Sequence, residues 1–410
     1  MNKDFSLKQH CHVNTNNDSD QFVGIQVTAE KVQISFPAGY ELSDSEDGIR
    51  NDILNLIDIL TEFKTDNSNI DFSGDNTFSL VDFPVHSYLF LIRDFLMTGH
   101  YYMKTTPISK TDIKGQIQWN KTFQNQHPYI QDDTDLIYTK FTVRNSITND
   151  TNILSLIHQY CVHQSFSILG WLYVNFIPPA PVYKISNNEA LSIINKQISK
   201  THKDKDLQLL FSMKSVLSSQ NGKTNRSISY YGVNKFHVIW ENLIDRAFGI
   251  TNKAEYYPHT CWLFNPGIRK NNHPLIPDSI MLLDDKCYIL DAKYYRYGIT
   301  GDPNHAPDSS DINKQVTYGD NIHATKPFDN AHLYNCFILP FNRNNNPFHL
   351  TKNINNVGEA RCLWRETKMN YERIQCVLCD VKFLMHNYAN MPHIQKEILA
   401  STIEISSRTI

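Results

Sequence analysis

The chain has 410 residues, of which 41% are hydrophobic and 20% charged, as is usual for a globular protein of two or three domains. No apolar run reaches the roughly 18 residues that cross a bilayer, and the polar first residues lack the apolar core of a secretory signal. The composition therefore argues against a membrane protein and predicts a cytoplasmic one.

The net charge of −3 is unevenly distributed along the chain. Residues 1–100 hold 6 Lys and Arg against 16 Asp and Glu, so the remaining residues carry an excess of positive charge. We expect attraction for DNA to reside in that basic remainder. The acidic part is expected to face solvent or a protein partner.

The amino-terminal half predicts an α+β domain over residues 21–200, after a polar and disordered start at residues 1–20. Alternating apolar residues predict strands at 22–27 and 32–36, and apolar residues at helical spacing predict helices at 52–63, 88–97, 153–166 and 207–217. The run Pro178-Pro179-Ala180-Pro181 interrupts the helical pattern. Lys110, Lys114 and Lys121 surround Trp119 and are candidates for phosphate contacts, although a solvated strand with one buried tryptophan fits the pattern better.

Gly222-Lys223-Thr224 resembles the end of a nucleotide-binding P-loop, but position 217, where that motif begins with glycine, holds Leu217. Asn221-Gly222 is more typical of a turn in a polar loop. We therefore expect this chain to carry no nucleotide-hydrolysing motor of its own.

The stretch from Pro277 to Tyr295 predicts a tight β-hairpin around the Asp284-Asp285 turn. If Leu283 faces Lys286, the same register places Asp278 directly opposite Asp291, with Cβ atoms roughly 4.5–5.5 Å apart. The two strands are nearly continuous apolar runs, which is typical of strands buried on both faces.

Lys293 follows Asp291 by two residues and therefore points to the same face of the hairpin. Two carboxylates so close together repel each other unless a positive charge lies between them. Mg²⁺ prefers oxygen ligands and keeps several waters, so a few carboxylates suffice to hold it. We expect Asp278 and Asp291 to bind Mg²⁺, and Lys293 to position or deprotonate a water that attacks a phosphate.

Two helices are predicted on either side of this hairpin in the sequence. Residues 235–249 carry an apolar stripe that includes Trp240, with Glu241 on its rim and Gly249 at its end. Residues 311–318 place Gln315 and Tyr318 on one helix face. From spacing alone, Glu241 could equally be a solvated helix residue, and Gln315 could belong to a plain amphipathic helix.

The hairpin resembles the PD-(D/E)xK nuclease motif, with Asp278 and Asp291 as the acids and Lys293 as the lysine. Together with its flanking segments, the chain is similar to the LlaJI-type restriction endonuclease family, which is related to McrC nuclease subunits. The resemblance covers residues 85–390 and rests on these segments: Ile113 to Trp119 (K-G-x-I-x-W), Trp240-Glu241-Asn242, Pro277-Asp278, Asp291 to Tyr295, Lys314-Gln315 and Tyr334 to Pro340.

The resemblance implies an α/β fold with a PD-(D/E)xK restriction-endonuclease-like core, a mixed sheet flanked by helices, over residues 201–410. The α+β amino-terminal domain would contact a partner or DNA. Glu241 would be a further metal ligand, and Gln315 would orient Lys293 or a phosphate.

The expected function is that of a restriction endonuclease subunit that hydrolyses double-stranded DNA together with a McrB-like AAA+ GTPase. We expect the amino-terminal domain, including Ile113 to Trp119, to dock on that GTPase. Two alternatives of the same class are a self-sufficient type II restriction enzyme and a DNA-repair nuclease. An alternative of another class is a non-catalytic assembly factor that stimulates the motor.

Overall fold

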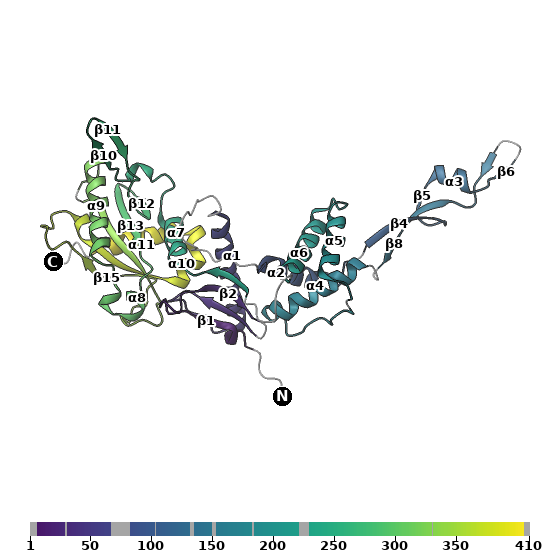
Figure 1. Cartoon of the computed structure of the whole chain (residues 1–410), viewed down its shortest axis with the longest axis horizontal. Helices are drawn as coiled ribbons and strands as arrows, with labels where there is room; N and C mark the ends of the chain where they lie inside the picture. The colour runs from purple at the N-terminus through teal and green to yellow at the C-terminus, as the bar shows by residue number, and fades with distance from the viewer. Residues whose placement is uncertain are drawn as a thin grey trace. The chain divides into compact units, whose positions relative to one another are not determined.

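The computed structural model describes residues 6–28, 31–66, 83–102, 104–131, 135–149, 153–182, 184–220, 229–329 and 331–405. The chain divides into two compact units (Figure 1). Unit 1 joins Met1–Val81 to Ile228–Ile410, and unit 2 comprises Asp82–Ser227. Residues 221–224, which resemble the end of a P-loop, lie outside the described residues.

Unit 1 is built on a five-stranded mixed sheet in the order β12-β13-β14-β16-β15. β13, β14 and β16 run parallel, while β12 and β15 are antiparallel to their neighbours. All nine residues of β14 are buried, as expected for a central strand covered on both faces. The strands are β12 (Ser279–Leu283), β13 (Lys286–Ala292), β14 (Leu333–Phe341), β15 (Ile354–Ala360) and β16 (Ile374–Asp380).

Helices cover both faces of this sheet, which confirms the α/β class. Tyr318 of α9 packs with Ile289 of β13 on one face, whereas Tyr288 donates to Glu404 of α11 at 2.5 Å on the other. Tyr294, on the same side as Tyr288, contacts Trp240 of α7. The helices of unit 1 are α1 (Glu46–Asp66), α7 (His237–Phe248), α8 (Tyr297–Thr300), α9 (Ser309–Thr325), α10 (Val381–Asn387) and α11 (His393–Ile405).

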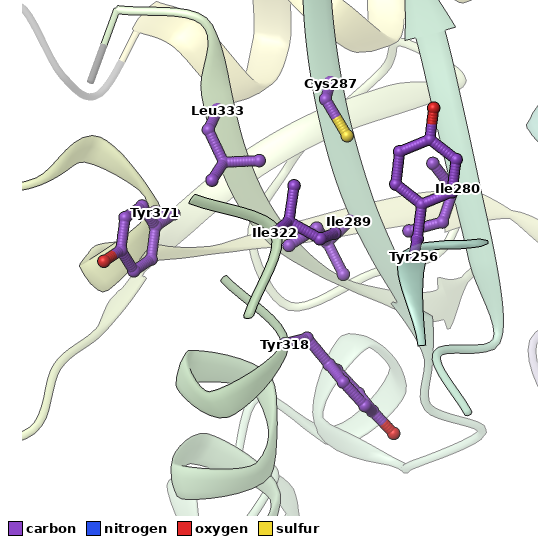
Figure 2. Packing of buried hydrophobic residues seen from close by; sticks show 8 residues of the cluster. All are labelled: Tyr256, Ile280, Cys287, Ile289, Tyr318, Ile322, Leu333 and Tyr371. Atoms are coloured by element: carbon purple, nitrogen blue, oxygen red, sulfur yellow. The ribbon is translucent and has the colours of Figure 1, made fainter. Parts of the chain in front are cut away.

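A buried cluster fastens α9 to the sheet (Figure 2). Its members come from three strands, from α9 and from the two short 3-10 helices η4 (Ala254–Tyr256) and η6 (Asn370–Glu372). Apolar burial of this kind is the main force that holds the layers together. The members are Tyr256, Ile280, Cys287, Ile289, Tyr318, Ile322, Leu333 and Tyr371.

A second sheet in unit 1 corrects the predicted domain boundary. Its order is β1-β3-β2-β9, and β2 pairs with β3 on one side and with β9 on the other, Val23 facing Val233. The amino-terminal strands thus belong with the carboxyl-terminal unit, and the predicted boundary after residue 200 falls inside unit 2. The bounds are β1 (Cys11–Val13), β2 (Val23–Val27), β3 (Val32–Phe36) and β9 (Ser229–Val233).

Residues 6–20 are also more ordered than their polar composition suggests. Leu7–His10 forms a 3-10 helix, and β1 pairs in parallel with β3. Leu7 is 1% exposed, so its buried side chain and the pairing of β1 together hold residues 7–13, which were expected to be disordered. Most acidic residues of the first hundred therefore belong to unit 1. They do not form the acidic surface of a separate amino-terminal docking domain, which corrects the prediction.

Unit 2 is an α+β unit. Its helices are α2 (Val85–Thr98), α3 (Trp119–Asn125), α4 (Ile153–Leu169), α5 (Asn187–Ile198) and α6 (Asp204–Gln220). Its strands are β4 (Lys104–Thr111), β5 (Gln116–Ile117), β6 (Tyr129–Gln131), β7 (Asp135–Ile137) and β8 (Thr142–Asn149), which form the sheets β4-β8-β5 and β6-β7.

Trp119 begins α3 and is 51% exposed, so the expectation of a buried tryptophan in a strand was wrong. Of its lysine neighbours, Lys110 pairs with Asp112 at 2.6 Å and Lys121 donates to Ser109 at 2.9 Å. Among the described helices, none is both long and apolar enough to cross a membrane.

Candidate active site

The predicted hairpin forms with the predicted register. Leu283 faces Lys286 and Ser279 faces Leu290, so the next opposed pair along the ladder is Asp278 and Asp291. Asp284 in the turn has a φ of 54°, the left-handed conformation that a tight hairpin turn uses and that aspartate tolerates. The short turn and the two buried strands therefore fix where both acids lie.

Lys293 lies between two carboxylates. Its Nζ is 2.9 Å from Oδ2 of Asp291 and 3.0 Å from Oδ1 of Asp311, in the first turn of α9. The three side chains are largely buried, at 3% exposed for Asp291, 16% for Lys293 and 13% for Asp311. Burial disfavours the charged lysine, but the two carboxylates outweigh it and raise the pKa of Lys293.

Asp311 is held in place from both sides. Asp308 caps α9, its carboxylate accepting the backbone N–H groups of Ser310 and Asp311. The hydroxyl of Tyr295 donates to Asp311 Oδ2 at 3.0 Å. The cap fixes the backbone of the first turn, so the Asp311 carboxylate points back to the end of β13.

Asp278 lies just before β12, beside the end of β13. Its carboxylate accepts the backbone N–H of Ala292 at 2.9 Å, and its backbone carbonyl accepts a hydrogen bond from Lys253 at 2.5 Å. Burial, with the charges of Asp291 and Glu241, raises the pKa of Asp278 well above its ordinary value. The site thus concentrates negative charge that a cation would relieve.

Glu241 enters the site from α7, on the opposite face of the sheet from α9. Burial raises the pKa of Glu241; nearby Lys293 acts against this rise and Asp291 adds to it. α7 ends before Gly249 as predicted, and the space beside Gly249 is too small for a Cβ, which would collide with Asp245 and Ser279. The structure therefore brings Glu241 within electrostatic range of the acid pair.

Gln315 lies elsewhere. Its side chain is 1% exposed, and Nε2 donates to the carbonyl of Ile289 at 3.0 Å and to Asn335 Oδ1 at 3.4 Å. Within the part of the chain that the structure describes, no hydrogen bond joins Gln315 to Lys293. Gln315 lies one helical turn after Asp311 and links α9 to β13 through Ile289, two residues before Asp291. This contact is structural.

A pocket of about 640 Å³ opens beside the end of β13. Glu241 and Lys293 line it, and the surrounding side chains are mainly polar or cationic. Such a lining suits an anionic substrate more than an apolar one. The other residues of the wall include Lys235, His237, Tyr295, Arg296, Asn304, His305 and Asp308.

Among the described residues, no three His, Cys, Asp or Glu side chains form a group that could hold a metal ion. However, Mg²⁺ commonly uses only one or two carboxylates and completes its shell with water and substrate oxygens. Oδ1 of Asp291 is buried and makes no hydrogen bond within the described part of the chain, so it remains available as a ligand. The donor chemistry of Asp278 and Asp291 therefore fits Mg²⁺.

Sequence reasoning missed Asp311 and Lys253. Asp311 stands four residues before Gln315, on the same helix face, so the predicted helix contained a signal for it. Lys253 lies in a loop without periodicity, and its contact with the Asp278 carbonyl depends on folding. It also pairs with Asp245 of α7 at 2.8 Å.

Asp278, Asp291 and Lys293 thus lie together where β12 begins and β13 ends in an α/β unit. A family model described as LlaJI restriction endonuclease matches residues 22–357. This match spans most of the chain, which therefore belongs to the LlaJI restriction endonuclease family.

Two further proteins resemble this chain. The type II restriction enzyme BsuMI component YdjA of Bacillus subtilis (strain 168) is 26% identical over 266 residues, which are 60% of this chain and 56% of that protein. The chain thus matches little more than half the length of this curated relative. A structure of Thermococcus gammatolerans McrB AAA+ hexamers with bound McrC aligns over 90% of this chain and 81% of its own, with 12% identity and a TM-score of 0.35. At that TM-score the structural likeness carries no argument.

Proposed function

We propose that this chain is the DNA-cleaving subunit of a restriction system and that it hydrolyses phosphodiester bonds of double-stranded DNA. The observation that carries the proposal is the buried cluster of Asp278, Asp291 and Lys293 at the edge of the sheet. Family membership supports DNA as the substrate. We further propose that the five-stranded sheet and its helices form a PD-(D/E)xK core.

The chain's own residues would act as follows. Lys293 is held by Asp291 and Asp311, so its ammonium can neutralise a phosphate oxygen that enters the pocket. Asp278 is held by the Ala292 N–H, which fixes its carboxylate at the end of β13. The fixed positions of these groups avoid reorganisation when charge develops on the phosphate.

Asp278 and Asp291 would hold Mg²⁺, and Glu241 would contact it directly or through a water. The ion would supply Lewis-acid stabilisation of the phosphate and lower the pKa of a bound water. The mutual repulsion of Asp278, Asp291 and Glu241 supports this assignment, because an additional cation would relieve it.

The test uses purified chain on plasmid DNA with Mg²⁺ or with EDTA. Asp291→Ala is expected to reduce cleavage on the order of a thousandfold, because it removes a metal ligand and a partner of Lys293. DNA binding should persist, because it rests mainly on phosphate contacts elsewhere. Asp285→Ala is the matched control, since Asp285 lies in the same hairpin but is 72% exposed and pairs with His332. Measurable cleavage by wild type that Asp291→Ala matches, with or without the GTPase partner proposed below, would refute the site.

We also propose a separate AAA+ GTPase partner. Unit 2 exposes apolar side chains, with Ile113 82%, Trp119 51% and Phe123 57% exposed, which suits protein contact. The same plasmid assay with and without the GTPase and nucleotide tests this. Efficient, site-specific cleavage by the chain alone would favour a self-sufficient enzyme. Motor stimulation by an Asp291→Ala chain, without cleavage by wild type, would favour a non-catalytic assembly factor.

A further inference from the structure

The hairpin β10–β11 (Cys261–Phe264 and Ile268–Asn271) extends from unit 1 beyond the ends of β12 and α9 (Figure 1). Every residue of both strands is exposed. A two-stranded ribbon without a packed face is marginally stable in water, and exposed apolar surface of this kind marks an interaction site. Its large apolar side chains are Trp262, Leu263, Phe264 and Ile268, which are 56%, 77%, 46% and 63% exposed.

The register of the ribbon assigns its side chains to two faces. Trp262 faces Lys270 and Phe264 faces Ile268, so these four side chains share one face. The rings of Trp262 and Phe264 stack, with centroids 5.6 Å apart and planes 13° from parallel. Arg269 lies on the opposite face. Each face thus joins apolar surface to a cation.

The charge of the ribbon favours an anionic partner over a neutral or basic one. Residues 258–276 contain Arg269 and Lys270 but no aspartate or glutamate. In a chain with more acidic than basic residues, such a segment stands out. Cations beside exposed aromatic rings are a common combination on nucleic-acid-binding surfaces.

The ribbon is anchored at the helix that also carries Asp311. Tyr318 of α9 donates to the carbonyl of Ile276 at 2.8 Å, and Asn321 of α9 donates to the carbonyl of Tyr256 at 3.0 Å. The two legs are joined by Leu275 N–H, which donates to the Pro258 carbonyl at 3.1 Å. The ribbon therefore has a fixed base beside the candidate site.

The distance along the chain places the ribbon close to the cleavage site. Asp278 follows the last residue of β11, Asn271, by seven residues, a span of at most about 25 Å. One turn of B-DNA is about 34 Å long. The end of β11 therefore lies within the length of one helical turn from a phosphate that reaches Asp278.

We propose that β10–β11 enters the major groove of the substrate duplex and contacts base edges there, an inference that rests on the proposed DNA-cleaving function. The major groove is about 12 Å wide and admits a two-stranded ribbon, whereas the minor groove is about 6 Å wide. Arg269 and Lys270 contact guanine edges or phosphates, and the Trp262 face packs against bases and thymine methyl groups. The ribbon thereby contributes to recognition near the cut.

The first test is duplex binding by the full chain without metal, measured by fluorescence anisotropy over a salt series. The double variant Trp262→Ala/Lys270→Ala removes one cross-strand pair. It is expected to bind about tenfold more weakly and to lower the salt slope by about 1. The matched control is Ile394→Ala/Lys396→Ala on α11, because Ile394 is 55% exposed and α11 covers the sheet face opposite α9. The control variant should bind like wild type.

The second test uses the natural thiol of Cys261, which is exposed while the other seven cysteines are buried or half-buried. A photo-cross-linker on Cys261 should join the protein to DNA, whereas the same reagent on a Cys261→Ser/Ile394→Cys chain should not. Wild type should also protect guanine N7, a major-groove atom, from dimethyl sulfate, and the Trp262→Ala/Lys270→Ala chain should protect it less.

The outcomes separate the two proposals. If the ribbon variant matches wild type in affinity, salt slope and N7 protection while wild type cuts DNA, the ribbon assignment is wrong and the nuclease stands. If wild type never cuts with Mg²⁺, even with the GTPase and nucleotide present, but binds DNA through the ribbon, the proposed nuclease function fails and the ribbon stands. Loss of binding to another protein or to a second copy, with unchanged DNA binding, would also overturn the ribbon assignment.

Discussion

Asp52 in α1 offers a direct test of how the amino-terminal segment joins the carboxyl-terminal one. The side chain is 1% exposed and lies 3.1 Å from Lys382 and 3.5 Å from His386, both in α10. It also accepts hydrogen bonds from Tyr40 at 3.0 Å and from the backbone of Ser43 at 2.8 Å. Asp52→Asn would remove the charge with little change of shape.

The stabilisation that the Asp52 charge provides follows from the pKa of its carboxyl group. Burial would raise the pKa of Asp52, but His386, Ser43 and Lys382 outweigh burial and lower it from 3.8 to about 2. A folded-state pKa below the unfolded one stabilises the protein above the unfolded pKa, and this stabilisation is lost as pH falls through the folded pKa. The charge should therefore contribute about 2 kcal/mol at pH 7 and roughly 1 kcal/mol at pH 3.

Urea denaturation of wild type and Asp52→Asn at pH 7, 5 and 3 measures this difference. The matched control is Asp58→Asn, because Asp58 lies on the same helix but is exposed. We expect a loss of about 2 kcal/mol at neutral pH that shrinks toward pH 3, and almost no loss for the control. A difference that does not depend on pH, or that equals the control, would refute the docking of α1 on α10.

Three further predictions concern the candidate site. Asp311→Asn should lower kcat by roughly tenfold to a hundredfold with little change in KM, because it removes a charged hydrogen bond to Lys293. Asp311→Glu should restore part of the rate. A change in KM alone would contradict this role of Asp311. Lys293→Arg should cut poorly, since a planar guanidinium cannot replace a compact ammonium between two carboxylates, and full activity would reduce Lys293 to a counter-charge. Glu241→Gln should raise the Mg²⁺ concentration needed for half-maximal cleavage, and an unchanged titration would remove Glu241 from the metal shell.

The central hairpin was predictable because local features determine it. A two-residue turn sets the register, and the apolar runs on both sides allow no slip without exposing a face. From these two features the sequence predicted the alignment of Asp278 with Asp291 and the orientation of Lys293. The helices that carry Glu241 and Gln315 were likewise predictable from periodicity.

Contacts between segments that are distant in the sequence were not predictable from local patterns. Val23 pairs with Val233, and nothing in either strand's own sequence specifies the other. Asp311 shows the same limit within the site. Its helix was expected, but its contact with Lys293 depends on how α9 packs on the sheet, and that packing arises from the buried cluster around Tyr318.

α9 therefore has a central place in unit 1, because one helix supports three parts of the proposed function. Its first turn presents Asp311 to Lys293, its middle ties Gln315 to β13, and Tyr318 and Asn321 hold the base of the β10–β11 ribbon. A shift of this helix would move the Asp311 carboxylate and the base of the ribbon together, so the packing of α9 on the sheet positions both a partner of Lys293 and the proposed DNA contact.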